Sequence, residues 1–290
     1  MQKTAVHKTE IPSSKVFVVR YLRDRHFDPY WHAHREYQLF VVLEGTGTRF
    51  IGDQIKSFRP GELVFTGPHL PHLWRSDEIY FARNSGLNAE GIVIYFDENF
   101  LGKDLHGKEE MVLLKKLLHR SARGLEFHGR CRAQVIEGMK ELTDLRGMAG
   151  VIQLLRILDT LAVSREYEYI SRGGFNQAYN QDETDRLNLV YDYVLKNFRR
   201  KIALTELADL LHMTQTSFSR YFTMQYSKPF TQFVSEIRIR EACRLLAETD
   251  DPVSHIGYQC GFNTLSNFNK QFRDLMLKKP SQYKREYRSL

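Results

Sequence analysis

Residues 207–222 read LADLLHMTQTSFSRYF and residues 256–272 read IGYQCGFNTLSNFNKQF, so one pattern recurs about fifty residues apart. The matched pairs are Leu207 with Ile256, Ala208 with Gly257, Met213 with Phe262, Phe218 with Phe268, Arg220 with Lys270, and Phe222 with Phe272. Each copy predicts a short amphipathic helix, a tight connection, and a second helix whose apolar residues share one side. This pattern is typical of a helix-turn-helix, and the second connection is one residue longer than the first.

The segment between the copies, residues 231–248, predicts a single amphipathic helix. Its length is about 27 Å at a rise of 1.5 Å per residue. One turn of DNA is about 34 Å, so a single chain could place two recognition helices in adjacent major grooves. We expect Thr205 to cap the first helix of the first copy, and the Asp-Asp-Pro-Val stretch at 250–253 to start the second copy.

The length of the chain and the distribution of its charge indicate its domain number and the kind of partner it binds. The chain has 290 residues, which favours two domains, and its 42 basic and 35 acidic residues give a formal net charge of +7. Residues 183–290 hold 17 basic and 12 acidic residues, which leaves 25 and 23 for residues 1–182. The basic C-terminal part favours a polyanionic partner.

The sequence disfavours a membrane protein, a secreted protein and a disulfide-bonded protein. No stretch is long and apolar enough for a membrane span, and the N-terminus lacks the apolar core of a secretory signal. We therefore expect a soluble, cytoplasmic protein with no membrane association. Cys131, Cys243 and Cys260 have no paired spacing, which favours buried free thiols over disulfides or a cysteine zinc site.

The pattern along the chain predicts an α+β protein of two domains. Residues 1–106 contain short runs of β-branched and aromatic residues between turn signals, as in a sandwich or small barrel. Residues 107–170 have helical periodicity, and these helices could cap the barrel or form a subunit interface. Residues 171–184 are polar and contain glycine, so we expect a linker there, followed by an all-helical domain at 185–290.

The C-terminal motifs carry a specific resemblance. They are Leu204-x-x-Leu-Ala, Phe218-Ser-Arg-x-Phe, Arg238-x-x-x-Ala-x-x-Leu-Leu, the 256–262 stretch and Lys279-Pro-Ser-Gln-Tyr-Lys. Because of these motifs, residues 202–287 resemble the double helix-turn-helix domain of AraC-type transcription regulators. The resemblance implies DNA base reading by Gln215, Thr216, Ser219, Arg220, Ser266, Asn267, Asn269 and Lys270.

The chemistry of these residues agrees with DNA binding. Amides can pair with adenine edges, Arg or Lys with guanine, and hydroxyls with several bases. Other basic residues suit phosphate contacts, which position a protein without reading sequence: Arg199, Arg200, Lys201, Arg273, Lys278, Lys279 and Lys284. Phe218, Phe222, Phe268 and Phe272 recur on the opposite face, so we expect them in the core.

The N-terminal domain resembles the cupin barrel that commonly precedes this DNA-binding domain. The residues that carry the resemblance are His32-Ala-His-Arg-Glu-Tyr-Gln, Glu44-Gly-Thr-Gly, Phe58-Arg-Pro-Gly-Glu-Leu-Val and Gly67-Pro-His-Leu-Pro-His. Cupins that bind metal use two histidines and a glutamate in the first motif and a histidine in the second. The corresponding residues here are His32, His34, Gln38 and His72, so a neutral amide replaces the carboxylate.

Period-two alternation places His32, His34, Gln38 and Phe40 on one strand face. Three imidazoles suit Zn, Fe, Cu or Ni, but the missing carboxylate weakens the case for a divalent ion. A metal-free pocket for a polar ligand is the leading expectation, with bound metal and purely structural histidines as alternatives. The pocket is expected to comprise His32, His34, Gln38, Arg49, His72, Trp74 and Tyr95, with no cofactor.

These features predict a transcription regulator, not an enzyme. A cupin-like sensor would bind a small polar effector, such as a carbohydrate, and helices 107–170 would support a homodimer. The expected partners are double-stranded DNA and, if the protein is an activator, RNA polymerase. The alternative is a metal-dependent cupin enzyme fused to a DNA-targeting module, which requires a complete metal site with an open position.

Overall fold

The computed structural model describes residues 11–82, 85–102, 104–105, 108–171, 181–226 and 228–288, without the side chains of 181–184, 287 and 288. The chain divides into two compact units, Met1–Asn180 and Gln181–Leu290. The first contains two sheets with helices, and the second is entirely helical where described. The predicted α+β class is confirmed.

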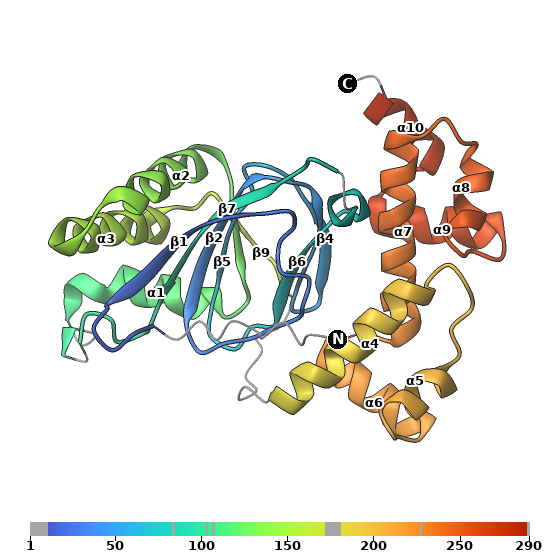
Figure 1. The fold of residues 1–290 in the computed structure, drawn as a ribbon, viewed down its shortest axis with the longest axis horizontal. Helices are drawn as coiled ribbons and strands as arrows, with labels where there is room; N and C mark the ends of the chain where they lie inside the picture. Colours follow the sequence, from blue (N-terminus) through green and yellow to red (C-terminus); the bar gives the residue numbers. More distant parts are fainter. Residues whose placement is uncertain are drawn as a thin grey trace. The chain divides into compact units, whose positions relative to one another are not determined.

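The first unit is built on two antiparallel sheets (Figure 1). The larger sheet has the strand order β1-β7-β2-β5-β8-β9, and the smaller has the order β4-β3-β6. The strands are β1 (Phe17–Asp24), β2 (Tyr37–Glu44), β3 (Gly47–Ile51), β4 (Gln54–Phe58), β5 (Leu63–Thr66), β6 (His72–Ser76), β7 (Ala89–Phe96), β8 (Leu125–Phe127) and β9 (Tyr167–Tyr169).

Alternation along the strands gives the larger sheet two different faces. One face contributes Leu39, Val41, Phe65 and Ile94 to a core shared with helices α1 (Val112–Ser121), α2 (Gly129–Asp144) and α3 (Gly147–Val163). The other face contributes a second core inside the barrel, where Phe40, Val64 and Val93 meet Trp74 of the smaller sheet. The helices between residues 107 and 170 therefore cover the barrel from outside, as one of the two interpretations of that segment predicts.

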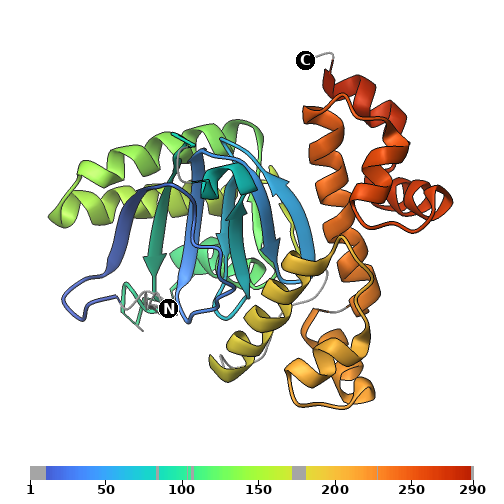
Figure 2. The ribbon, with the colours of Figure 1, turned by 45° about the vertical axis from the view of Figure 1, so that its right-hand side comes forward.

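The second unit arranges its helices around α7 (Phe230–Glu248). The other helices are α4 (Gln181–Asn197), α5 (Leu204–Leu210), α6 (Gln215–Tyr226), α8 (Val253–Gln259), α9 (Leu265–Met276) and α10 (Pro280–Arg288). Figures 1 and 2 show α5 with α6 at one end of α7, and α8 with α9 at the other end. The predicted helix at 231–248 and the predicted paired helices are thus present.

Local boundaries differ from the sequence-based expectations in two places. Helix α5 begins at Leu204 with Ala203 as its N-cap, so the prediction that Thr205 caps it is wrong. The Ala203 N–H instead donates to Glu206 Oε1 at 2.7 Å, and a carboxylate in the first turn replaces a capping hydroxyl. Helix α4 begins at Gln181, inside the linker predicted for 171–184, while residues 172–180 lie outside the described residues.

The first unit also contains short strands that lack a continuous apolar run. Strands β4, β8 and β9 are short, and polar residues such as Lys56 and Glu126 interrupt their apolar residues.

None of the described helices is long and apolar enough to cross a membrane.

Candidate nucleic-acid interface and barrel interior

The second helices of both helix-turn-helix units, α6 and α9, begin in the same way. Thr214 Oγ1 accepts a hydrogen bond from the Ser217 N–H, and Thr264 Oγ1 accepts one from the Asn267 N–H, both at 3.2 Å. A threonine at this position satisfies one of the free N–H groups of the first turn. The two threonines lie fifty residues apart, so the repeat includes the helix cap as well as the apolar core.

Each unit packs its second helix on a different part of α7. Phe222 of α6 contacts Phe230 and Phe233 in the first turns of α7, with ring centroids 5.3 Å apart in both pairs. Phe268 and Phe272 of α9 belong to a core with residues 239–246 of α7. The four phenylalanines predicted as core, Phe218, Phe222, Phe268 and Phe272, are all fully buried, which confirms that prediction.

The opposite faces of these helices are polar and accessible. Of the eight residues predicted to read bases, seven are exposed and Ser219 is half-buried. Among the described residues, neither Arg220 nor Lys270 forms an ion pair. The base-reading assignment remains a prediction, and it concerns side chains whose donors face solvent.

Several of the residues predicted to contact phosphate already bind groups of their own domain. Arg199 pairs with Glu241 at 3.0 Å, and Arg200 pairs with Glu206 at 2.7 Å. Lys278 pairs with Glu286, and Lys284 donates to the Asp251 carbonyl. Lys201, Arg273 and Lys279 are exposed, and no ion pair is recorded for them within the described part of the chain. Sequence alone could not separate these two groups, because the acidic partners lie up to 42 residues away.

A short segment after α4, residues 198–200, contacts elements of both helix-turn-helix units. Arg238 of α7 donates to the Phe198 carbonyl from Nε and to the Arg200 carbonyl from Nη2, each at 2.7 Å. Arg200 also binds Glu206 of α5, and this pairing, with a hydrogen bond from Tyr193, lowers the pKa of Glu206 to about 2. We call residues 198–200 with Arg238 the clamp.

The clamp also touches the turn of the second unit. Gly261 has a φ of +85°, and a Cβ added there would lie 2.6 Å from the Phe198 carbonyl oxygen and 2.7 Å from that of Arg199. Only glycine fits this approach without displacing backbone. The corresponding residue of the first unit is His212, which adopts a φ of +55° in an exposed turn.

The barrel of the first unit brings together the histidines predicted from its sequence. The rings of His32 and His72 lie 4.5 Å apart between centroids, and those of His34 and His72 lie 5.1 Å apart. Gln38 Oε1 lies 3.1 Å from Nε2 of both His34 and His72. Tyr95 packs against His34 with centroids 5.3 Å apart, so five of the seven predicted pocket residues form one cluster.

The backbone segments that place these histidines differ from the expected ones. Strand β2 begins only at Tyr37, so the prediction that His32 and His34 share a strand face with Gln38 and Phe40 is wrong. His32 pairs with His72 through two backbone hydrogen bonds, and the His34 carbonyl accepts from the His69 N–H. Burial lowers the pKa of His34 to about 4 and also lowers the pKa of His72, so both rings are neutral near pH 7.

Two segments of the chain match known domain families. A model of the helix-turn-helix domain matches residues 207–286, and a model of the cupin domain matches residues 22–78. The chain therefore combines an AraC-type helix-turn-helix domain with a cupin domain. The described fold, a cupin-type barrel and a domain with two helix-turn-helix units, agrees with these two domain matches.

Individual relatives of this AraC-type regulator are distant. An uncharacterized HTH-type transcriptional regulator of Bacillus subtilis, YdeC, is 21% identical over 260 residues, which are 88% of this chain and 85% of YdeC. The probable transcriptional regulator LumQ of Photobacterium leiognathi is 30% identical over 107 residues, which are 36% of this chain and 43% of LumQ. Among solved structures, ToxT from Vibrio cholerae matches at 17% identity over 93% of this chain and 98% of its own, with a TM-score of 0.37.

Arg49, Trp74 and an acidic pair form a second polar cluster in the barrel of this AraC-type regulator. Arg49 is 1% exposed and contacts both Glu62, at 3.2 Å, and Glu126. Trp74 Nε1 donates to Glu62 at 3.2 Å, and the Trp74 ring contacts His72. Burial raises the pKa of Glu62, while Arg49 and Lys56 outweigh burial at Glu126 and lower its pKa.

This cluster changes the expected role of Arg49. Two carboxylates contact its guanidinium, so it joins β3 to Glu62, the residue before β5, and to β8, and it does not simply face an open pocket. Glu62 and Glu126 were not predicted as site residues. Glu62 lies in the Phe58-Arg-Pro-Gly-Glu-Leu-Val stretch that carries part of the cupin resemblance, and that position could have indicated a role for it. A lone glutamate in the short β8 gives no such signal.

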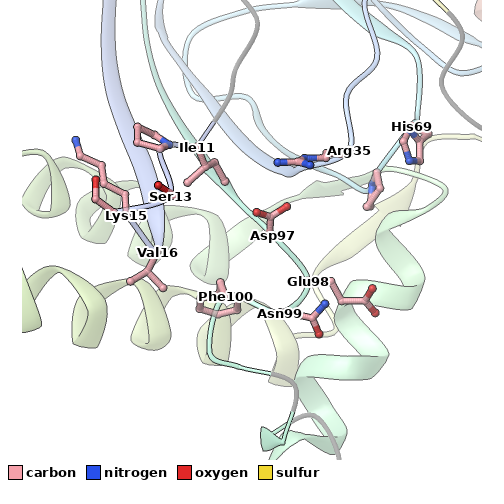
Figure 3. Close-up of a pocket in the computed structure, with 13 residues that line it drawn as sticks. Ile11, Ser13, Lys15, Val16, Arg35, His69, Asp97, Glu98, Asn99 and Phe100 are labelled. Atoms are coloured by element: carbon pink, nitrogen blue, oxygen red, sulfur yellow. The ribbon is translucent and has the colours of Figure 1, made fainter.

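A surface pocket of about 930 Å³ lies at the barrel rim, and Figure 3 shows Arg35, His69, Asp97 and Glu98 around it. Residues of both charge signs line the pocket, and the sequence did not predict it. It adjoins the histidine cluster through the His69 N–H, which donates to the His34 carbonyl at 2.7 Å.

Proposed function

We propose that this AraC-type regulator binds specific DNA sequences with α6 and α9 and is controlled by a small polar molecule in its barrel. The observation that carries the proposal is the repeated design of the two helices. Each has a threonine cap, buried phenylalanines, and an exposed face with amide, hydroxyl and basic groups. A helix with such a face can enter the major groove and pair with base edges.

The side chains of the barrel cluster indicate the chemical class of the effector. The clustered imidazoles, Gln38 and Tyr95 suit a polar molecule, and a carbohydrate or related metabolite is our proposed class. The effector would act by binding unequally to two states of the regulator, because only a difference in affinity shifts an equilibrium. Cupin and helix-turn-helix relatives support a regulator over the alternative of a metal-dependent enzyme.

We propose a cytoplasmic homodimer that activates transcription through RNA polymerase. Helix α3 supports the dimer because Met148 is 72% and Val163 is 58% exposed, although other residues of the helix pack on the barrel. Apolar side chains left on one helix can be covered by a second copy.

Selection of bound fragments from genomic DNA, followed by mobility-shift titration of the full chain, tests DNA reading. We expect Arg220→Ala and Lys270→Ala each to reduce discrimination between cognate and mutated sites by about 1–3 kcal/mol. Lys196→Ala is the matched control, because it removes an exposed charge from α4 and should not change sequence preference. If both recognition-helix variants keep the wild-type preference, the base-reading assignment is wrong.

A further inference from the structure

The pocket at the barrel rim, which we call the rim pocket, forms where four strand ends meet. Phe17 of β1 and Tyr37 of β2 both pair with Phe96 of β7, and Gln38 of β2 pairs with Thr66 of β5. The segments beyond these pairs therefore leave the larger sheet at one edge, and they line the pocket with residues 11–16, Arg35, residues 68–69 and residues 97–100. The volume of about 930 Å³ is within the range of roughly 300–1,000 Å³ that small-molecule sites occupy.

Two hydrogen-bonded turns hold the lining of the rim pocket in place. The Phe100 N–H donates to the Asp97 carbonyl at 3.2 Å, and the Lys15 N–H donates to the Pro12 carbonyl at 2.8 Å. Phe100 also packs on Phe96 at the edge of the core, with ring centroids 5.0 Å apart. The lining is therefore held by the chain itself, as small-molecule sites usually are.

His69, in the wall of the rim pocket, has two features that are common at binding sites. Its backbone is left-handed, with a φ of +59°, which is a strained conformation for a residue with a Cβ. Nδ1 of its ring is buried and has no hydrogen-bond partner in the part of the chain that the structure describes. The His69 N–H donates to the His34 carbonyl at 2.7 Å, so the strained turn is fixed to the segment before β2. Strain and an unsatisfied buried nitrogen in one residue favour a functional role for this wall.

Charges of both signs line the rim pocket without neutralising one another. Lys15 and Arg35 are basic, whereas Asp97 and Glu98 are acidic. Arg35 pairs at 3.2 Å with Glu36, which does not line the pocket, and no ion pair of Lys15 or Asp97 is recorded within the described residues. Asp97 is half-buried, so a cation beside it would interact with its carboxylate more strongly than at a fully exposed site.

The apolar side chains of the rim pocket lie apart from its guanidinium group. Figure 3 shows Val16 and Phe100 on one side of Asp97 and Arg35 on the other side. A ligand that uses all three parts carries an ammonium group for Asp97, a carboxylate for Arg35, and an apolar group for Val16 and Phe100. The planar guanidinium suits a carboxylate, because it can donate two parallel hydrogen bonds. An amino acid or a short peptide with an apolar side chain has all of these groups.

We propose that the rim pocket binds a zwitterion of amino-acid or dipeptide size with an apolar side chain. Asp97 holds the ammonium group, and Arg35 holds the carboxylate. The rim pocket lies outside the histidine cluster of the barrel, so it is a second ligand site in addition to the proposed effector site. A free amino acid and a dipeptide share this chemistry, and the pocket has room for either.

Calorimetric titration of the full chain with L-leucine and with leucyl-leucine tests the ligand class. Binding of either probe supports the class, and the tighter of the two identifies the source. Two analogues of leucine are the matched ligands, because 3-methylbutylamine lacks the carboxylate and 4-methylpentanoate lacks the ammonium group. We expect one zwitterion per chain, with each analogue weaker than leucine by about 10–100-fold, as for a lost hydrogen bond between charged groups. If neither zwitterion binds, or if an analogue binds as tightly as leucine, the proposal is overturned.

Variants of the two charged residues locate the ligand. Asp97→Asn and Arg35→Gln should each weaken binding of the zwitterion by about 10–100-fold. Asp97→Asn should not change the affinity for 4-methylpentanoate, which has no ammonium group for Asp97. Asp159→Asn is the matched control, because that carboxylate is exposed on α3.

Gln38→Ala distinguishes the rim pocket from the barrel interior, because it alters only the histidine cluster. It should leave binding of leucine unchanged. If Gln38→Ala abolishes binding while Asp97→Asn preserves it, the ligand occupies the proposed effector site and the rim site is wrong. Should a variant fail to fold, the comparison of leucine with its two analogues on the wild-type chain still decides.

Discussion

The two helix-turn-helix units share a core and a cap but differ in how their turns are held. The second unit presses Gly261 against the carbonyls of Phe198 and Arg199, and its helices form one apolar core with the C-terminal part of α7. The first unit has the exposed His212 at the matching position, and the ion pair of Glu206 with Arg200 ties it to the clamp. The two units therefore share a fold but contact the rest of the domain differently. Both of them contact the clamp.

Gly261→Ala should have the largest effect, because it removes the closest of these attachments. The new Cβ would need a left-handed backbone and would lie within 2.7 Å of two carbonyl oxygens. We expect a loss of about 2–4 kcal/mol in the free energy of unfolding, from overpacking and backbone strain together. Denaturant unfolding of the full chain, followed by hydrogen exchange in α8 and α9, measures it.

Gly147→Ala provides the matched control for this prediction. Gly147 has a φ of +59°, but nothing lies within 4 Å of a Cβ built there. That variant measures the cost of the left-handed conformation without the steric contact. Equal losses for the two variants would show that the close approach of Gly261 to the clamp has no energetic consequence.

The contrast between the units also explains what could be predicted from the sequence. Apolar periodicity and the fifty-residue repeat predicted the paired helices, the long α7 and the buried phenylalanines, because burial imposes a period on sequence. The histidine cluster was predicted by motif, yet its strand placement was wrong because His32 and His34 precede β2. The clamp and the Arg49 cluster were not predicted. They depend on carbonyls and on charged partners up to 77 residues away, which leave no local pattern.

Arg238→Met tests whether the clamp sets the two units relative to each other. The change removes the two 2.7 Å hydrogen bonds to the Phe198 and Arg200 carbonyls while keeping an unbranched side chain. We expect a loss of about 1–3 kcal/mol in the free energy of unfolding. Binding to a selected site with both half-sites should weaken more than binding to either half-site alone, in mobility-shift titrations.

Arg238→Lys is the companion variant, because it keeps the charge but loses the planar fork that reaches two carbonyls at once. It should resemble Arg238→Met in the comparison of full and half sites. A lysine variant that behaves as wild type would assign the effect to charge, and the clamp would then have no geometric role.

His212→Gly should have the smallest effect, and in the opposite direction. A histidine at a φ of +55° adopts a conformation that L-residues disfavour, and no contact of the second unit's kind requires glycine in that turn. Glycine relieves this strain but adds entropy to the unfolded chain, so we expect a net gain of about 0.5–1 kcal/mol in the free energy of unfolding. Denaturant unfolding measures the gain, with His255→Gly inside α8 as a control that should destabilise. If His212→Gly destabilises the protein as well, the histidine makes a contribution in the first unit that the glycine of the second does not, and the two turns differ in more than their exposure.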